Sequence, residues 1–171
     1  MIVGVFGSAF NPPTRGHLDA IYQGLSVCDE VWLVPSIAHA FGKDMLPFSV
    51  RWQMLNAFAM DINEPSVKAC DIERELWDGE GPVYTYDVML GLQSRFPEHK
   101  FLFLCGPDNA QRFSEFAFHQ QIRERWGVYP LKENLPTRST IVRRMVGARD
   151  PINDLVTSRV HHIIEQRQLY V

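Results

Sequence analysis

Apolar residues along the chain fall into short runs that alternate with longer stretches in which they recur every three or four positions. The short runs predict five strands, at residues 2–6, 31–34, 67–72, 101–105 and 127–129. The periodic stretches predict helices at residues 16–25, 48–60 and 86–96, another opening near residue 138, and one or two more between 151 and 168. This alternation is typical of parallel strands joined by crossover helices. We therefore expect an α/β fold with a doubly wound parallel sheet and flanking helices.

Polar loops follow three of the predicted strand ends, at residues 7–17, 35–43 and 106–109. In a Rossmann-like sheet of this kind, ligands bind beyond the carboxyl ends of the strands, so the three loops are expected to cluster at one edge. The Gly-x-Gly-x-x-Gly fingerprint of dehydrogenases does not follow the first strand. Repeats and interdomain linkers are also missing, and we expect one domain spanning residues 1–171.

The first of these loops has the features of an anion-binding turn. Gly7 is expected to end the strand, because a residue without a Cβ lets the backbone turn and leaves N–H groups open to a ligand. Gly16 removes bulk where the chain approaches a phosphate. Thr14 is a good helix N-cap, and His17 falls in the first helical turn, so both side chains face one ligand. Taken alone, Thr-x-x-His is better explained by a capped helix with a surface histidine, since short motifs often match by chance.

Motifs along almost the whole chain change that balance. The first loop resembles the Gly-x-Phe-x-Pro-x-x-x-Gly-His signature of the nucleotidylyltransferase superfamily, as Gly7-Ser8-Ala9-Phe10-Asn11-Pro12-Pro13-Thr14-Arg15-Gly16-His17. Gly106-Pro107-Asp108-Asn109 resembles its Gly-x-Asp-Asn loop, and Ser139-Thr140-x-Val142-Arg143 its terminal Ser-Thr-x-Ile-Arg. Residues 71–73 and 81–87 resemble the segment around the pyridine nucleotide. The order and spacing are most similar to bacterial nicotinate-mononucleotide adenylyltransferases.

The resemblance implies attack by the phosphate of nicotinate mononucleotide on the α-phosphorus of ATP, with release of pyrophosphate. It assigns His17 as hydrogen-bond donor to the α-phosphate, with Thr14 assisting. The implied ATP-binding residues are Gly7, Ser8, Ala9, Phe10, Gly16, Arg138, Ser139, Thr140 and Arg143. The implied acceptor-binding residues are Lys43, Arg51, Thr85, Gly106 and Asp108. Mg²⁺ is expected to accompany ATP, and the sequence shows no carboxylate cage for a metal of the protein's own.

Several of these residues also have simpler explanations. Arg51 fits either a surface charge at a helix start or a phosphate contact. Asp108 suits a Gly-Pro-Asp turn as well as a contact to ribose hydroxyls. Thr85 suits the N-cap of the helix at 86–96 as well as a nicotinate pocket. Lys43 lies where relatives place a substrate-facing His-Lys pair, although the spacing differs.

Two departures from the family pattern leave the substrates open. Thr14 stands where many relatives carry a second histidine, and the phosphopantetheine branch often has threonine there. The segment 118–135 is shorter than in relatives, and a tryptophan common in the family is replaced by Phe116 or Phe118. The alternatives are therefore the same chemistry on nicotinamide mononucleotide, on phosphopantetheine or on a CTP-dependent substrate. A nucleotide-binding regulatory protein that has lost turnover is the alternative from another class.

Composition and charge narrow the classes of partner and of stabilising site that we expect for this protein. The chain has 171 residues, 46% of them hydrophobic, which is enough for one core. A net charge of -3 argues against broad binding to nucleic acid. Cys28, Cys70 and Cys105 are odd in number and far apart, so neither a disulfide framework nor a zinc site is indicated and buried free thiols are expected.

The chain also shows no targeting signal. Met1 leads directly into the first strand, and no apolar run is long enough to span a membrane. We therefore expect a cytoplasmic protein with ATP and a pyridine mononucleotide as its partners, and with neither nucleic acid nor membrane among them. The sequence leaves the oligomeric state open, a homo-oligomer included.

Overall fold

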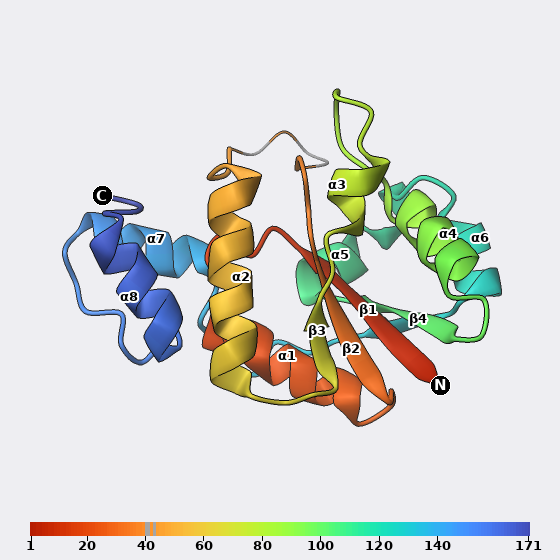
Figure 1. The fold of residues 1–171 in the computed structure, drawn as a ribbon, viewed down its shortest axis with the longest axis horizontal. Helices are drawn as coiled ribbons and strands as arrows, with labels where there is room; N and C mark the ends of the chain where they lie inside the picture. The colour runs from red at the N-terminus through yellow and green to blue at the C-terminus, as the bar shows by residue number, and fades with distance from the viewer. Residues whose placement is uncertain (40–41, 43) are drawn as a thin grey trace.

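The protein folds around one parallel sheet with helices on both faces, a single-domain α/β architecture that confirms the expected fold class (Figure 1). The computed structural model describes residues 1–39, 42 and 44–171. The strand order is β3-β2-β1-β4-β5, and every neighbouring pair is parallel. The strands are β1 (Ile2–Ser8), β2 (Glu30–Pro35), β3 (Val67–Ala69), β4 (Lys100–Cys105) and β5 (Val128–Pro130). The order reverses between β1 and β4, which is where ligands bind in sheets of this type.

Helices cover both faces of the sheet. One face carries α1 (Arg15–Leu25), α2 (Phe48–Ile62), α7 (Ser139–Gly147) and α8 (Ser158–Gln166), and α8 packs against α2 (Figure 1). The other face carries α3 (Ile72–Leu76), α4 (Thr85–Arg95) and α6 (His119–Arg125). Two short pieces, α5 (Pro107–Gln111) and η1 (Phe113–Glu115), connect β4 to α6.

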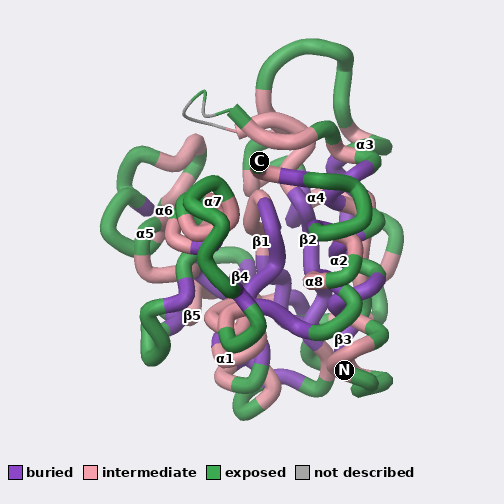
Figure 2. Tube along the Cα trace, turned by 90° about the vertical axis from the view of Figure 1, so that its left-hand side faces the viewer, coloured by how far each residue is buried: buried purple, intermediate pink, exposed green. Residues whose placement is uncertain are grey.

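Alternation along the strands divides the buried side chains between two cores. Val3 and Val5 of β1 face the core under α4, whereas Phe6 faces the core under α1 and α2. In β4, Phe103 faces the core under α4, and Leu104 faces the core under α1 and α2. Successive side chains in a strand point to opposite faces, so a sheet covered on both faces needs apolar residues at every position. Figure 2 shows the buried strands in the middle of the molecule, surrounded by partly exposed helices and loops.

Two expectations on element limits need correction. The strand predicted at 67–72 ends at Ala69, and Ile72 begins α3 instead. Acidic residues in the first turn of α3 favour the helix, and Ile72 is buried whichever element holds it. Gly7 lies inside β1, which continues to Ser8, so Gly7 does not end the strand. The helices α3, α5 and α6 were not predicted, and between 151 and 168 there is one helix, α8.

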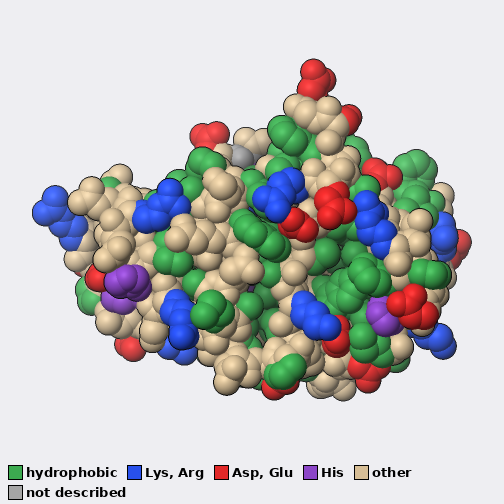
Figure 3. Space-filling model, viewed as in Figure 1, with side chains coloured by type: hydrophobic (Ala, Val, Ile, Leu, Met, Phe, Trp, Pro, Cys, Tyr) green, Lys and Arg blue, Asp and Glu red, His purple; other side chains and the backbone are tan. Residues whose placement is uncertain are grey.

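The three cysteines are free, with Cys28 and Cys105 buried and Cys70 half-buried. The face shown in Figure 3 carries positive and negative side chains interspersed. Among the described residues, no helix has both the length and the apolar character needed to cross a membrane.

Candidate active site

A cleft of about 670 Å³ opens at the carboxyl ends of the strands. It lies where β1 and β4 diverge, with the β1–α1 loop at its floor and the starts of α4, α5 and α7 around it. Most of the predicted site residues line it, namely Gly7, Ser8, Ala9, Phe10, Thr14, Gly16, His17, Thr85, Gly106, Asp108, Arg138, Ser139, Thr140 and Arg143. Arg51 lines a neighbouring pocket rather than the cleft, and Lys43 lies outside the described residues. The structure therefore brings together residues that are up to 136 positions apart in the chain, Gly7 and Arg143.

Thr14 and His17 form a reciprocal cap at the start of α1. Thr14 is the N-cap, as predicted, and its hydroxyl accepts hydrogen bonds from the N–H groups of Gly16 and His17 at 3.1 and 3.4 Å. The His17 ring completes the box, because its Nδ1 accepts from the Thr14 N–H at 2.9 Å. Glutamate or glutamine usually fills this position in a capping box, and here an imidazole does so. The helix start thus fixes the orientation of the ring.

These contacts also decide where the imidazole carries its proton. The Thr14 N–H is only a donor, so Nδ1 of a neutral ring is the acceptor and the hydrogen resides on Nε2. Nε2 lies 3.2 Å from the hydroxyl of Ser8 and borders the cleft. Burial lowers the pKa of His17 to about 4. The centroids of the Phe6 and Phe10 rings lie 6.0 and 4.9 Å from the centroid of the imidazole. His17 is therefore a neutral, oriented hydrogen-bond donor at the positive end of α1.

The β1–α1 loop that precedes Thr14 is held from several directions. Arg51 donates to the carbonyl oxygens of Ala9 at 2.9 Å and of Leu46 at 2.8 Å. Arg143 donates to the Asn11 carbonyl at 2.8 Å. The left-handed backbone of this loop is at Phe10, with φ 49°. Arg51 is only 1% exposed, so it is not the surface charge considered from the sequence, and its described bonds support the loop.

Gly16 has a packing role that differs from the expected one. A Cβ at this position would lie 2.8 Å from the Thr137 hydroxyl and 3.2 Å from the Thr137 carbonyl oxygen. Glycine therefore lets the segment before α7 approach the first turn of α1. The phosphate-approach explanation for Gly16 remains a prediction, whereas the close contact to Thr137 is observed.

The start of α7 forms another wall of the cleft. Arg138 is its N-cap, and Ser139 and Thr140 are its first helical residues. The Ser139 hydroxyl donates to the Pro12 carbonyl at 2.7 Å, which ties α7 to the β1–α1 loop. Arg143 lies one turn further, with one nitrogen 3.2 Å from the Thr140 hydroxyl. The first-turn amides of a helix have no intrahelical acceptors, so two helix N-termini, of α1 and α7, border one cleft.

Arg138 bridges two acidic side chains across the cleft mouth. It donates to both carboxylate oxygens of Glu133, at 2.6 and 2.5 Å, and lies 3.0 Å from Asp108 at the start of α5. Hydrogen bonding to Glu133 raises the pKa of Arg138, and Arg138 in turn lowers the pKa of Glu133. The guanidinium predicted to contact ATP thus also positions Asp108, a predicted ribose contact.

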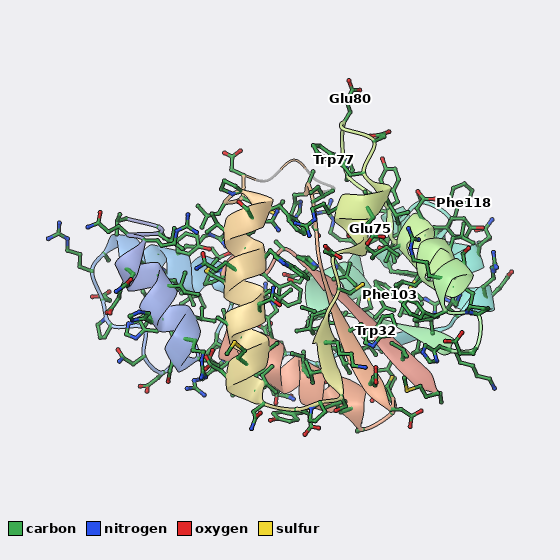
Figure 4. All side chains as sticks on the ribbon, viewed as in Figure 1. Trp32, Glu75, Trp77, Glu80, Phe103 and Phe118 are labelled. Carbon is green, nitrogen blue, oxygen red and sulfur yellow. The ribbon has the colours of Figure 1, made fainter. Side chains whose placement is uncertain are left out.

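The opposite wall carries the predicted acceptor residues and one that sequence reasoning missed. Thr85 lines the cleft but is the first helical residue of α4; the N-cap is Tyr84, so the capping role considered for Thr85 is wrong. Phe116 lines the cleft, whereas Phe118 packs against Tyr86 at 4.8 Å beside α4 and α6 (Figure 4). Of the two candidates, Phe116 is the one that lines the cleft.

Glu73 on α3 is the missed residue. It is 6% exposed, lines the cleft and accepts a hydrogen bond from the Ile37 N–H at 3.2 Å. Burial raises the pKa of Glu73 to about 8, against the opposing effects of the Ile37 N–H and Arg51. The sequence signal was Asp71-Ile72-Glu73, but Glu73 follows directly after the predicted strand 67–72 and no helix was expected there.

The shortened segment before α7 is closed by side chains of α1. The Gln23 side-chain amide donates to the Lys132 carbonyl and accepts from the Lys132 N–H, both at 2.8 Å. It thus satisfies both backbone groups of Lys132, as a neighbouring strand would. Asp19 accepts from Gln23 at 2.9 Å and from Asn134 at 3.0 Å. A short loop thereby forms a defined wall of the cleft.

Comparison with known proteins agrees with this geometry. The cytidylyltransferase-like family matches residues 5–145. A probable nicotinate-nucleotide adenylyltransferase of Cytophaga hutchinsonii is 30% identical over 99% of this chain and 98% of its own length. The nicotinate-nucleotide adenylyltransferase of Bacillus subtilis is 28% identical over 98% of this chain and 97% of its own. The crystal structure of a putative nicotinate-nucleotide adenylyltransferase from Vibrio parahaemolyticus has a TM-score of 0.86 at 32% identity, covering 99% of this chain and 94% of that one. The chain belongs to the cytidylyltransferase-like family of nucleotidyltransferases, among relatives named nicotinate-nucleotide adenylyltransferases.

Proposed function

We propose that the protein transfers the adenylyl group of ATP to nicotinate mononucleotide, forming nicotinate adenine dinucleotide and pyrophosphate. The observation that carries the proposal is the neutral His17 ring, whose Nε2–H borders a cleft flanked by two helix N-termini. The names of the full-length relatives supply the acceptor. The domain responsible is the whole of residues 1–171, acting on substrates in the cytoplasm.

In the proposed reaction an oxygen of the acceptor phosphate attacks the α-phosphorus of ATP, and the bond to the bridging oxygen of pyrophosphate breaks. The acceptor phosphate is already anionic, so the reaction needs no general base for the nucleophile. His17 donates from Nε2 to an α-phosphoryl oxygen, exchanging Ser8 for the phosphate as its partner. One such oriented donor is worth roughly 3–4 kcal/mol in the transition state. Thr14 holds the ring in this orientation through its backbone N–H.

The β- and γ-phosphates are proposed to lie at the start of α7. Ser139 and Thr140 place the first-turn amides there, and Arg143 and Arg138 add positive charge. Gly7, Ser8, Ala9, Phe10 and Gly16 form the floor beneath the nucleotide. Mg²⁺ enters as part of the MgATP substrate. In the described part of the chain, no three His, Cys, Asp or Glu side chains are grouped so that they could hold a metal ion.

The acceptor is proposed to lie on the other side of the cleft. Thr85 and Gly106 border the pyridine ring, and Asp108 contacts ribose hydroxyls in the position that Arg138 gives it. Arg51 acts on the acceptor through the loop that it supports. Lys43 is retained, from the sequence alone, as a proposed contact to the anionic acceptor. A homo-oligomer is compatible with this arrangement, because the cleft is built within one chain.

The test is the variant His17→Ala, with His162→Ala on exposed α8 as the matched control. Pyrophosphate release and ATP binding are measured separately. We expect His17→Ala to lose about 100-fold or more in kcat, as for removal of a donor to developing charge, while ATP still binds. The control keeps wild-type turnover. Wild-type turnover in His17→Ala would remove the imidazole from the mechanism, and ATP binding without turnover in the wild type would favour a regulatory protein.

A further inference from the structure

The C-terminal residues after α8 reach the β1–α1 loop. Arg167 is the C-cap of α8, and Gln168 and Tyr170 then take positive φ angles of 51° and 64°. Leu169 anchors the turn in the core at 9% exposure, and its N–H donates to the Ile164 carbonyl at 3.0 Å. Two left-handed residues, one on each side of a buried leucine, define a specific path rather than a frayed end.

That path places the Tyr170 hydroxyl against the signature loop. It donates to the Asn11 side-chain oxygen at 2.6 Å, a contact between residues 159 positions apart in sequence. Asn11 is 4% exposed and lines the cleft. Burial raises the pKa of Tyr170, so the phenol keeps its proton and remains a donor over the neutral pH range.

Asn11 is one link in a chain of contacts that ends at His17. Its carbonyl accepts from Arg143, and the carbonyl of the next residue, Pro12, accepts from Ser139. Two residues further, the Thr14 N–H holds Nδ1 of His17. The backbone that presents this N–H is thus fixed by α7 through its carbonyls and by the C-terminus through the Asn11 side chain.

We propose that Tyr170 is a positioning residue for adenylyl transfer: its hydroxyl holds Asn11, and thereby the backbone that orients His17. The inference rests on the proposed function for its kinetic consequence. Without the hydroxyl, Asn11 keeps a buried oxygen with no donor from Tyr170, and the loop relaxes to supply one. The expected effect is on the precision of the His17 donor rather than on the presence of the nucleotide site.

The test compares Tyr170→Phe with Tyr22→Phe, whose ring is 53% exposed on α1. We expect Tyr170→Phe to lower kcat about fivefold or more, the size of one lost hydrogen bond, with KM for ATP within about twofold of wild type. Tyr22→Phe keeps wild-type kinetics. In an Asn11→Ala background, Tyr170→Phe adds less than about a twofold further loss, because both changes break one link. An unchanged kcat in Tyr170→Phe, or losses that multiply in the double variant, would overturn the proposal.

A second readout does not depend on turnover. The ¹⁵N shifts of the His17 ring report which nitrogen carries the hydrogen, and we expect the wild type to show the Nε2–H form. Tyr170→Phe should move these shifts toward a mixture of tautomers, whereas Tyr22→Phe leaves them in place. A wild-type protein that releases no pyrophosphate would contradict the proposed function alone; the shifts would then decide the positioning role, and identical shifts in wild type and Tyr170→Phe would overturn it.

Discussion

The buried carboxyl of Glu73 makes a quantitative prediction about stability and pH. The unfolded chain releases this proton near the ordinary pKa of 4.5, whereas the folded protein keeps it until about pH 8. Between these values the native state binds more protons than the unfolded state, so Glu73 lowers the free energy of unfolding as pH rises. At 1.36 kcal/mol per pH unit, the loss relative to pH 4.5 is on the order of 3 kcal/mol at pH 7.

The variant Glu73→Gln isolates this effect. Glutamine keeps an oxygen for the Ile37 N–H and has no charge to desolvate. We expect the variant to differ least from the wild type near pH 5, to exceed its stability increasingly up to about pH 8, and to show no further gain above it. Urea unfolding at four pH values between 5 and 8.5 measures the difference. Since other groups titrate equally in both proteins, they cancel from it.

The matched control is Glu75→Gln, two residues along α3, where the carboxylate is half exposed and lies 3.2 Å from Arg95 (Figure 4). Glu75→Gln removes an exposed carboxylate from the same helix, so it shows whether the effect of Glu73→Gln depends on burial. A stability difference between Glu73→Gln and wild type that does not grow with pH would refute the reasoning. It would mean that the buried carboxylate is stabilised in its charged form by Arg51.

Two further predictions concern His17 and the short loop before α7. Burial lowers the pKa of His17 in the folded protein to about 4, so between pH 6.5 and 4 the unfolded chain binds a proton that the folded protein does not, and the wild type loses stability as pH falls. His17→Gln keeps a capping-box residue but has no ring to titrate, so it should lose less stability over this range. Urea unfolding at pH 4.5 and 7 measures this, and equal losses in the two proteins would contradict it. Gln23→Ala should cost about 1–2 kcal/mol by unpairing the Lys132 backbone and should raise KM for ATP, with exposed Gln120→Ala as the control. Urea unfolding and pyrophosphate kinetics check both effects, and wild-type values for Gln23→Ala would show that the loop holds without it.

The strands of the sheet were predictable from short runs of apolar residues, because helices cover both faces of the sheet. Val3, Val5 and Phe6 are buried on opposite sides, and such a run is visible in sequence as continuous hydrophobicity. The same continuous apolar pattern extended the predicted strand to Ile72, which is instead the first, buried residue of α3. A short apolar stretch does not record whether its neighbours continue as strand or turn into a helix.

The site was predictable where its residues share a motif and not where distant segments meet. Thr14 and His17 are three positions apart, so their capping contact follows from helix geometry. Tyr170 meets Asn11 across 159 positions, and no local pattern announces that contact. Arg51 was named as a site residue from the sequence, but its structural role was not predictable. Its burial and its hydrogen bond to Ala9 depend on how α2 packs against the loop.

The most direct test of the central claim is the rate at which the wild-type protein releases pyrophosphate from MgATP with each candidate acceptor. The account predicts turnover with nicotinate mononucleotide at a kcat/KM at least about tenfold above that for nicotinamide mononucleotide, phosphopantetheine or CTP-dependent pairs, a preference of about 1.4 kcal/mol. The dinucleotide product is identified by mass. A protein that binds ATP yet forms no dinucleotide from any pyridine mononucleotide would contradict the account.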